Sequence, residues 1–93
     1  MPSCVFDIET NGLEEKLTKV HCIVIYDIET QEYHKYAPDE VPDGIVKLSI
    51  YDKLIGHNII SFDIPALNKV FNWSPRPEVQ IQDTLIMSRL MYP

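Results

Sequence analysis

With 93 residues, the chain is long enough for a single domain spanning residues 1–93, and a domain of this size buries about 60–65% of its unfolded surface. Hydrophobic residues make up 45% of the sequence and charged residues 24%, which is ordinary for a soluble globular domain. The net charge of −6 argues against a basic nucleic-acid-binding surface over the whole chain. It leaves a phosphodiester substrate open, because metal ions can supply local positive charge.

The sequence also indicates the compartment. It contains no signal peptide, no lipidation motif and no apolar run near 18 residues, so we expect a cytoplasmic protein that does not contact a membrane. Cys4 and Cys22 lie in apolar, strand-like runs and form no C-x-x-C pair. We therefore expect both to be reduced thiols in the core.

The first predicted element is a strand over residues 3–9 that ends in two carboxylates, Asp7 and Glu9, before the turn pair Asn11-Gly12. Side chains two residues apart in an extended chain point to the same face, so these two acids project together. They repel each other unless a cation neutralises them, and Mg²⁺ or Mn²⁺ prefers carboxylate oxygen. A solvated strand end, with both acids facing water, fits the same spacing equally well.

The next two predicted strands cover residues 20–27 and 33–36, and the short turn between them makes them antiparallel neighbours. This turn contains a second copy of the tetrapeptide Asp-Ile-Glu-Thr, which first occurs at residues 7–10. Because the second copy lies where the chain reverses, we expect Asp27 and Glu29 to face water. We assign them no catalytic role.

The rest of the chain alternates helices and strands. We expect a helix over residues 43–52 capped by Asp43, a buried strand at 54–57, a helix at 63–71, a strand at 79–82, and a final helix from Asp83 to about Met91. The order β-β-β-α-β-α-β-α predicts an α/β fold with a mixed sheet. An antiparallel pair lies at one side of that sheet and parallel strands lie at the other.

A second candidate segment covers residues 56–67, where a strand ends, a loop follows and Asp63 begins a helix. Asp63 suits a helix N-cap, and a packed or hydrogen-bonded side chain is a better interpretation of His57 than a metal ligand. Ligands of α/β sheets gather at the carboxyl ends of parallel strands. If strands 3–9 and 54–57 are parallel neighbours, Asp7, Glu9 and Asp63 lie at one such edge.

Three stretches together, VFDIETNGL, IGHNIISFDIPAL and QDTLIMSRL, resemble the 3′–5′ exonuclease (proofreading) domain of family A DNA polymerases, in particular those of short-tailed bacteriophages. The resemblance covers nearly the whole chain. It implies a ribonuclease H-like fold with a sheet in the order 3-2-1-4-5. It also implies hydrolysis of DNA from a single-stranded 3′ end.

The resemblance assigns roles to individual residues. Asp7 and Glu9 match the first exonuclease motif and Asp63 the second, and in this family these carboxylates hold two divalent cations, Mg²⁺ or Mn²⁺, at the scissile phosphate. The other matching positions are Thr10 and Leu13, where the family contacts the 3′-terminal nucleotide, Asn58 and Phe62, which line the single-strand groove, and Asp83, a supporting or capping residue. No role is carried over for His57.

The sequence departs from the family in one respect: the third motif, with a Tyr or His and a fourth metal-binding Asp, does not occur within the 93 residues. We therefore expect weak activity or none from this chain alone. A polymerase chain could complete the site, and a homodimer could form through apolar residues of the final helix, namely Leu85, Ile86, Leu90 and Met91. The alternative is a non-catalytic module that binds a polymerase, a nucleic acid or a host protein.

Overall fold

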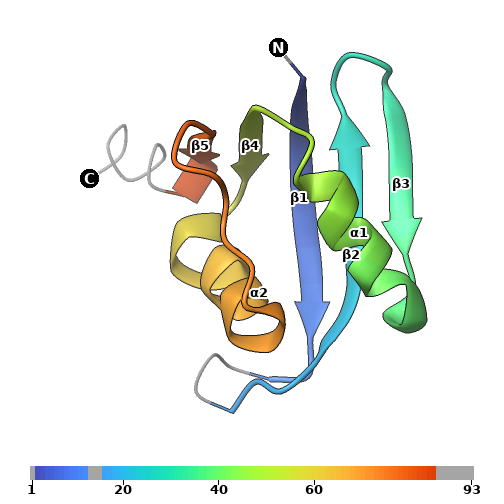
Figure 1. The fold of residues 1–93 in the computed structure, drawn as a ribbon, viewed down its shortest axis with the longest axis vertical. Coiled ribbons are helices and arrows are strands. Elements are labelled where there is room, and N and C mark those ends of the chain that lie inside the picture. Colours follow the sequence, from blue (N-terminus) through green and yellow to red (C-terminus); the bar gives the residue numbers. More distant parts are fainter. Residues whose placement is uncertain (1, 13–15, 86–93) are drawn as a thin grey trace.

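Five strands joined into one mixed sheet form the centre of the fold (Figure 1). The computed structural model describes residues 2–12 and 16–85. The strands are β1 (Ser3–Thr10), β2 (Val20–Asp27), β3 (Glu32–Tyr36), β4 (Lys53–Gly56) and β5 (Gln80–Asp83). Their order is β3-β2-β1-β4-β5. β1, β2 and β3 pair antiparallel, whereas β4 and β5 add in parallel on the other side of β1. The predicted strand order is confirmed.

Both α-helices lie on the same side of this sheet (Figure 1). They are α1 (Val41–Leu48) and α2 (Ile64–Phe71), each preceded by a short turn of another helix type, η1 (Pro38–Glu40) and η2 (Ile59–Asp63). Their apolar side chains share one core with the inward residues of the strands. The buried core is made of Cys4, Phe6, Ile8, Leu17, Val20, Ile23, Ile25, Val41, Leu48, Tyr51, Leu54, Ile59, Ala66 and Leu67.

The alternation along β1 determines which face carries the acids. Side chains at even positions from Cys4 to Ile8 are buried in the core, and those at the odd positions Val5, Asp7 and Glu9 are exposed on the opposite face. Neither α1 nor α2 covers that opposite face (Figure 1). Asp7 and Glu9 therefore lie on an open surface of the sheet.

Helix α1 differs from its predicted bounds. It begins at Val41, with Glu40 as N-cap, and ends at Leu48, so Asp43 lies inside the first turn. The start is earlier because Pro42 fits the first turn of a helix, where its missing N–H is not needed. In the turn before it, a Glu40 side-chain oxygen accepts a hydrogen bond from the N–H of Ala37 at 3.1 Å.

The prediction that Asp27 faces water is wrong. Its side chain is only 8% exposed, and its carboxylate accepts hydrogen bonds from the Tyr51 hydroxyl and the Thr30 N–H, both at 2.9 Å. The Thr30 N–H, followed by the Tyr51 hydroxyl, lowers the pKa of Asp27. Glu29 is exposed, and it accepts the N–H of Ser3 at 2.7 Å. The second Asp-Ile-Glu-Thr copy thus ties the β2–β3 turn to the rest of the sheet.

The Tyr51→Phe variant is expected to be less stable than the wild type by about 1–2 kcal/mol, because it leaves the Asp27 carboxylate short of one buried donor. The lowered pKa means that the bonded carboxylate contributes stability above the unfolded pKa and loses it as the pH falls through the folded pKa. Urea unfolding at pH 7 and in acid checks both points. An equal difference between variant and wild type at both pH values would contradict this assignment.

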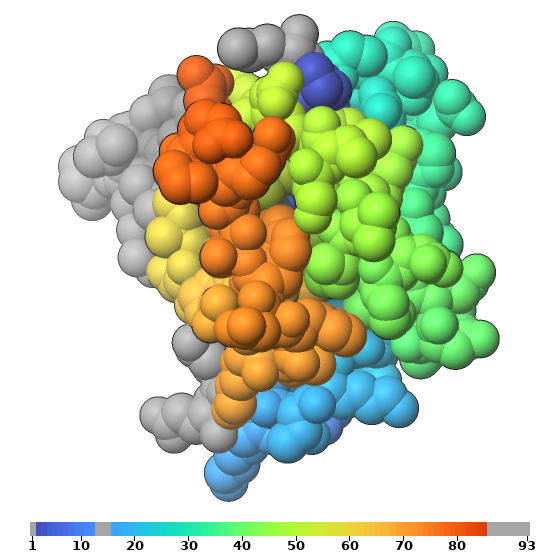
Figure 2. Space-filling view, in the orientation of Figure 1, coloured from blue at the N-terminus to red at the C-terminus, as the bar shows by residue number. Residues whose placement is uncertain are grey.

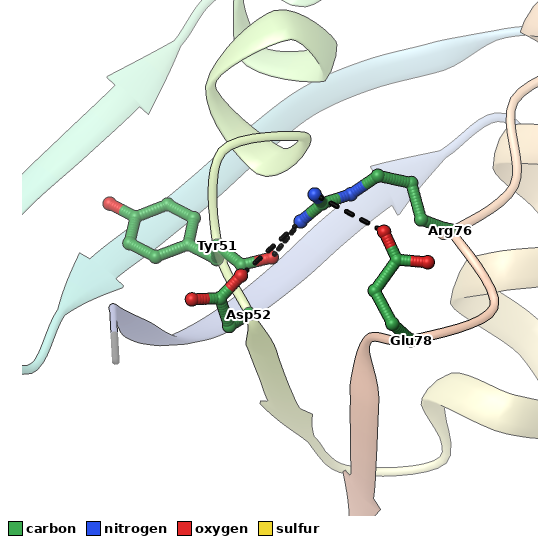
Figure 3. A network of polar contacts seen from close by, with 4 residues as sticks. All are labelled: Tyr51, Asp52, Arg76 and Glu78. Atoms are coloured by element: carbon green, nitrogen blue, oxygen red, sulfur yellow. Dashed lines mark hydrogen bonds and ion pairs between the residues drawn. The ribbon is translucent and has the colours of Figure 1, made fainter.

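The segment between α2 and β5, residues 72–79, is hydrogen-bonded to the turn at the end of α1. In Figure 2 this segment (orange) lies against α1 and its C-terminal turn (green), where the Trp73 Nε1–H donates to Ser49 Oγ at 3.0 Å. Arg76 reaches the same turn, donating to the Tyr51 carbonyl at 3.2 Å and to Asp52 Oδ1 at 3.4 Å (Figure 3). These contacts hold the residues just before β4 against the segment that leads into β5.

Of the two cysteines that were expected in the core, one is fully buried. Cys4 is buried and Cys22 half-buried, both are free thiols, and burial is the main cause that raises the pKa of Cys4 to about 12. Among residues 2–12 and 16–85, no helix has the length and apolarity needed to cross a membrane. Of the final helix, Thr84 and Leu85 are helical, and Ile86, Leu90 and Met91 lie outside the described residues.

Candidate active site

The candidate site lies where β1 continues past the end of β4. The two strands pair only from Ser3 to Val5 on β1, so the edge of β1 beyond Val5 has no β4 partner. The N–H of Ile8 on this edge is bound instead by the carboxylate of Asp63. Asp63 therefore meets β1 beside the position from which Asp7 projects.

Two local features bring Asp63 to this edge. Gly56 ends β4 in close contact with the Phe6 carbonyl and Ile59, where a side chain would not fit. Asn58 then adopts a left-handed conformation (φ 60°, ψ 31°), which asparagine tolerates better than most residues. The five-residue π-helix η2 follows and ends at Asp63. A π-helical turn of this kind is uncommon in proteins and is frequently found at functional sites.

The Asp63 side chain does not cap the helix that follows it. The residue itself is helical (φ −62°, ψ −49°), and its carboxylate makes no capping hydrogen bond. It is only 4% exposed, and its Oδ2 atom has no hydrogen-bond partner among the described residues. The N-cap interpretation, left open by the sequence, therefore does not explain this aspartate.

The pKa of Asp63 reports on its surroundings. Burial, followed by the negative charge of Asp7, raises this pKa from 3.8 to about 7, and Asp83 adds a smaller increase. The hydrogen bond from the Ile8 N–H acts in the opposite direction. Asp63 is thus a buried carboxyl group close enough to Asp7 for their charges to interact. A buried carboxyl group with an unpaired oxygen, near a second carboxylate, is suited to binding a hard cation.

The structure brings together some of the predicted residues and leaves others apart. The negative charge of Asp7 acts on Asp63, and Glu9 shares the open face of β1 with Asp7. Within the described residues, no group of three or more acidic, cysteine or histidine side chains is placed to hold one ion. Asp7 and Asp63 lie close enough for their charges to interact, and Glu9 belongs to no such group among these residues. The convergence of Asp7, Glu9 and Asp63 on one metal site therefore stays a prediction.

The predicted substrate-contacting residues lie on different elements. Thr10 ends β1, and its hydroxyl donates to the Gly12 carbonyl at 2.9 Å. Phe62 is half-buried and packs on the core from η2. Leu13 lies outside the described residues. His57, exposed, makes a hydrogen bond with Thr84 at 3.0 Å, in agreement with the hydrogen-bonded interpretation.

One component of the site could not be predicted from side-chain patterns. The Ile8 N–H binds Asp63, and every non-proline residue carries the same group. Its availability depends on β4 being shorter than β1, a property of the sheet register. A difference in length between two predicted parallel strands, four residues against seven, was the available signal.

Known proteins resemble this chain in sequence and in fold. The DNA-directed DNA polymerases of Enterobacteria phage T3 and Escherichia phage T7 are 38% and 36% identical over 97 aligned positions. Each match covers 95% of this chain and 14% of the relative, so the chain spans about one seventh of their length. The family B DNA polymerase of the archaeon Pyrobaculum calidifontis matches the fold with a TM-score of 0.59 and 18% identity, over 74% of this chain and 10% of that one.

The resemblance to bacteriophage polymerases is thereby confirmed. A model of the RNase H superfamily matches residues 4–91, which include β1 from Cys4 onward, the other four strands and both α-helices that the structure describes. The sheet order fits that match. The chain belongs to the RNase H superfamily.

Proposed function

We propose that the chain is the N-terminal part of the 3′–5′ exonuclease domain of a DNA polymerase, which hydrolyses phosphodiesters at a single-stranded 3′ end during proofreading. The names of the phage relatives support the polymerase context, since both are DNA-directed DNA polymerases. The observation that carries the proposal is the buried Asp63 carboxylate, which interacts with the charge of Asp7 and has one oxygen without a hydrogen-bond partner among the described residues. Such a group needs a cation or a proton to be stable.

The residues present fit divalent metal ions. Asp7 and Asp63 would hold Mg²⁺ or Mn²⁺ through carboxylate oxygens, the ligands that these ions prefer. A pair of such ions supplies positive charge and Lewis acidity at the scissile phosphate. Glu9, exposed on the same face as Asp7, would orient the attacking water and accept its hydrogen bond. The net charge of −6 makes this local positive charge necessary for an anionic substrate.

The substrate would lie along the same face. Thr10 and Leu13, at and after the end of β1, are proposed to contact the 3′-terminal nucleotide. Asn58 and Phe62 are proposed to line the groove for the single strand, and the half-exposed Phe62 ring offers an aromatic surface for a base. The fourth acidic ligand of the family does not occur in these 93 residues. A polymerase chain, or a second copy of this chain, is proposed to complete the site.

The test combines metal binding with cleavage. We expect the purified chain to bind Mn²⁺ weakly, as measured by electron paramagnetic resonance. The affinity should fall at least tenfold in Asp7→Ala, because one of the two neighbouring carboxylates is lost. The exposed acid Asp39, mutated to alanine, is the matched control and should bind Mn²⁺ like the wild type. A 5′-labelled single-stranded oligodeoxynucleotide is expected to lose 3′ nucleotides slowly or not at all.

Two results would contradict the proposal. Equal Mn²⁺ binding by the wild type and Asp7→Ala would remove Asp7 from the metal site. Rapid 3′-end degradation by the wild-type chain, abolished in Asp7→Ala, would refute the claim that the site is incomplete. Both measurements use the same two proteins, so they can be made on one preparation.

A second candidate function is favoured by the open face of the sheet. Val5 is 40% exposed and Tyr33 75% exposed, and together with Val24 and Tyr26 they line a hollow of about 330 Å³ beside Asp7. Apolar surface of this kind is typical of a protein-binding site. A non-catalytic module would dock this face on a polymerase chain. It would bind that chain equally well with and without Mn²⁺.

A further inference from the structure

A carboxylate outside the proposed metal ligands is bonded to the start of the segment that carries Asp63. Asp83, the last residue of β5, is 4% exposed. Its Oδ1 accepts the N–H of Asn58 at 2.9 Å, and its Oδ2 accepts the N–H of Ile60 at 3.0 Å. Oδ1 also accepts the N–H of Leu85 at 2.9 Å, in the turn that follows β5. Both oxygens of Asp83 are therefore directed at backbone donors.

Asp83 binds backbone N–H groups at the start of η2, where a helix has no acceptor of its own for them. The first N–H groups of any helix have no partner within the helix, and leaving them buried and unpaired is unfavourable. Asn58, just before η2, makes no side-chain capping bond and is in the left-handed conformation. A single carboxylate on the neighbouring strand thus replaces the missing cap. Hydrogen bonds to a charged acceptor are also roughly twice as strong as neutral ones.

The hydrogen bonds of Asp83 fix the start of η2 and thereby influence the position of Asp63 at its end. η2 runs from Ile59 to Asp63, so fixing the N–H of Ile60 fixes the first residues of a five-residue turn whose last residue carries the carboxylate. The pairing of β4 with β5 ends with Gly56 opposite Asp83, so Asp83 lies beside the start of this segment. The Asp63 carboxylate at the other end of the turn then meets the Ile8 N–H.

We propose that Asp83 is a positioning residue for the candidate active site, which acts through the backbone of the Asn58–Ile60 segment to hold the Asp63 carboxylate against Ile8 and Asp7. The inference rests on the proposed function for its chemical consequence, metal affinity. The placement of Asp63 can be measured without any metal. A merely structural role, capping the turn at Leu85, predicts a general loss of stability and no selective effect at Ile8.

The first readout is metal-free. In Asp83→Asn the amide group keeps the shape of the side chain but presents an N–H to one of the two backbone donors. Hydrogen exchange of the Ile8 amide, measured by NMR, is expected to accelerate at least tenfold relative to that of Ile25 in the centre of β2. Tyr51→Phe, which removes a buried hydrogen bond elsewhere, is the matched control. Its Ile8 to Ile25 exchange ratio should equal that of the wild type.

The second readout is Mn²⁺ affinity, which should fall by about 10- to 100-fold in Asp83→Asn and stay unchanged in Tyr51→Phe. An unchanged Ile8 to Ile25 ratio in folded Asp83→Asn overturns the inference. If that variant does not fold, the same ratio is measured in Asp83→Glu, which keeps the charge and displaces the oxygens, and a wild-type ratio there overturns it as well. Absence of Mn²⁺ binding by the wild type counts against the proposed function, and the exchange ratio still decides the inference.

Discussion

At pH 8 and without divalent metal ions, the Asp63→Asn variant is expected to be more stable than the wild type, by up to about 4 kcal/mol. The reason is that burial and the charge of Asp7 raise the pKa of Asp63 from 3.8 to about 7. Each unit of pKa shift corresponds to about 1.4 kcal/mol of difference between the two protonation states. Asparagine carries no charge and can accept the Ile8 N–H through its oxygen.

The sign of the pH dependence follows from the direction of the shift. Because the pKa of Asp63 is higher in the folded chain, the folded state binds the proton more tightly than the unfolded state. The unfavourable contribution of the charged carboxylate is therefore absent below pH 4, grows as the pH rises, and is complete above pH 7. The advantage of Asp63→Asn should accordingly shrink to about 1–2 kcal/mol at pH 5.

Urea unfolding with a chelator present, at pH 8 and pH 5, measures this difference. Asp39→Asn removes an exposed acid in the turn before α1 and serves as the matched control, with an expected change below about 0.5 kcal/mol. If the free energy of unfolding of Asp63→Asn at pH 8 rises no more than that of the control, the charged Asp63 carboxylate does not destabilise the fold. A residue that lowers stability and is nevertheless present is expected at functional sites, where activity needs groups that folding does not favour.

The sheet could be predicted from the sequence because its determinants are local. Alternation of apolar residues along β1, and the short turn between β2 and β3, predict the strands and their antiparallel pairing. The resemblance then supplied the complete strand order, which the structure confirms. The start of α1 was predicted incorrectly because Asp43 and Pro42 are both typical of a helix start. Here the proline determines where the helix begins.

The contacts of the candidate site could not be predicted from the sequence. Asp63 has the sequence context of an N-cap, and it departs from that role because η2 precedes α2 and Asp83 binds the backbone 20 or more residues earlier in the chain. Asp27 likewise lies in a turn sequence, and its burial depends on Tyr51, 24 residues away. Local patterns contain no information on these partners. The surroundings of Asp27 and of Asp63 each depend on a contact between segments that are distant in the sequence.

Gly56→Ala is expected to destabilise the fold by about 2–3 kcal/mol, because overpacking a well-packed site forces both side chains and backbone to move. A Cβ atom on Gly56 would overlap the Cγ2 methyl of Ile59 and lie 2.9 Å from the carbonyl oxygen of Phe6. Ile59 is fully buried and the carbonyl belongs to the central strand, so neither can move aside easily. The closeness of β4 to β1 at this point also determines where the Asn58–Asp63 segment begins.

Gly12→Ala is the matched control for this variant, because no atom lies within 4 Å of the Cβ position at Gly12 and its φ is not positive. Reducing the freedom of the unfolded chain should leave Gly12→Ala unchanged or more stable by about 0.4–1 kcal/mol. Urea midpoints of the two variants should therefore move in opposite directions from that of the wild type, or only Gly56→Ala should move. Equal midpoints for both variants would mean that β4 can retreat from β1 without loss. The edge of β1 that receives Asp63 would then not be determined by the packing at Gly56.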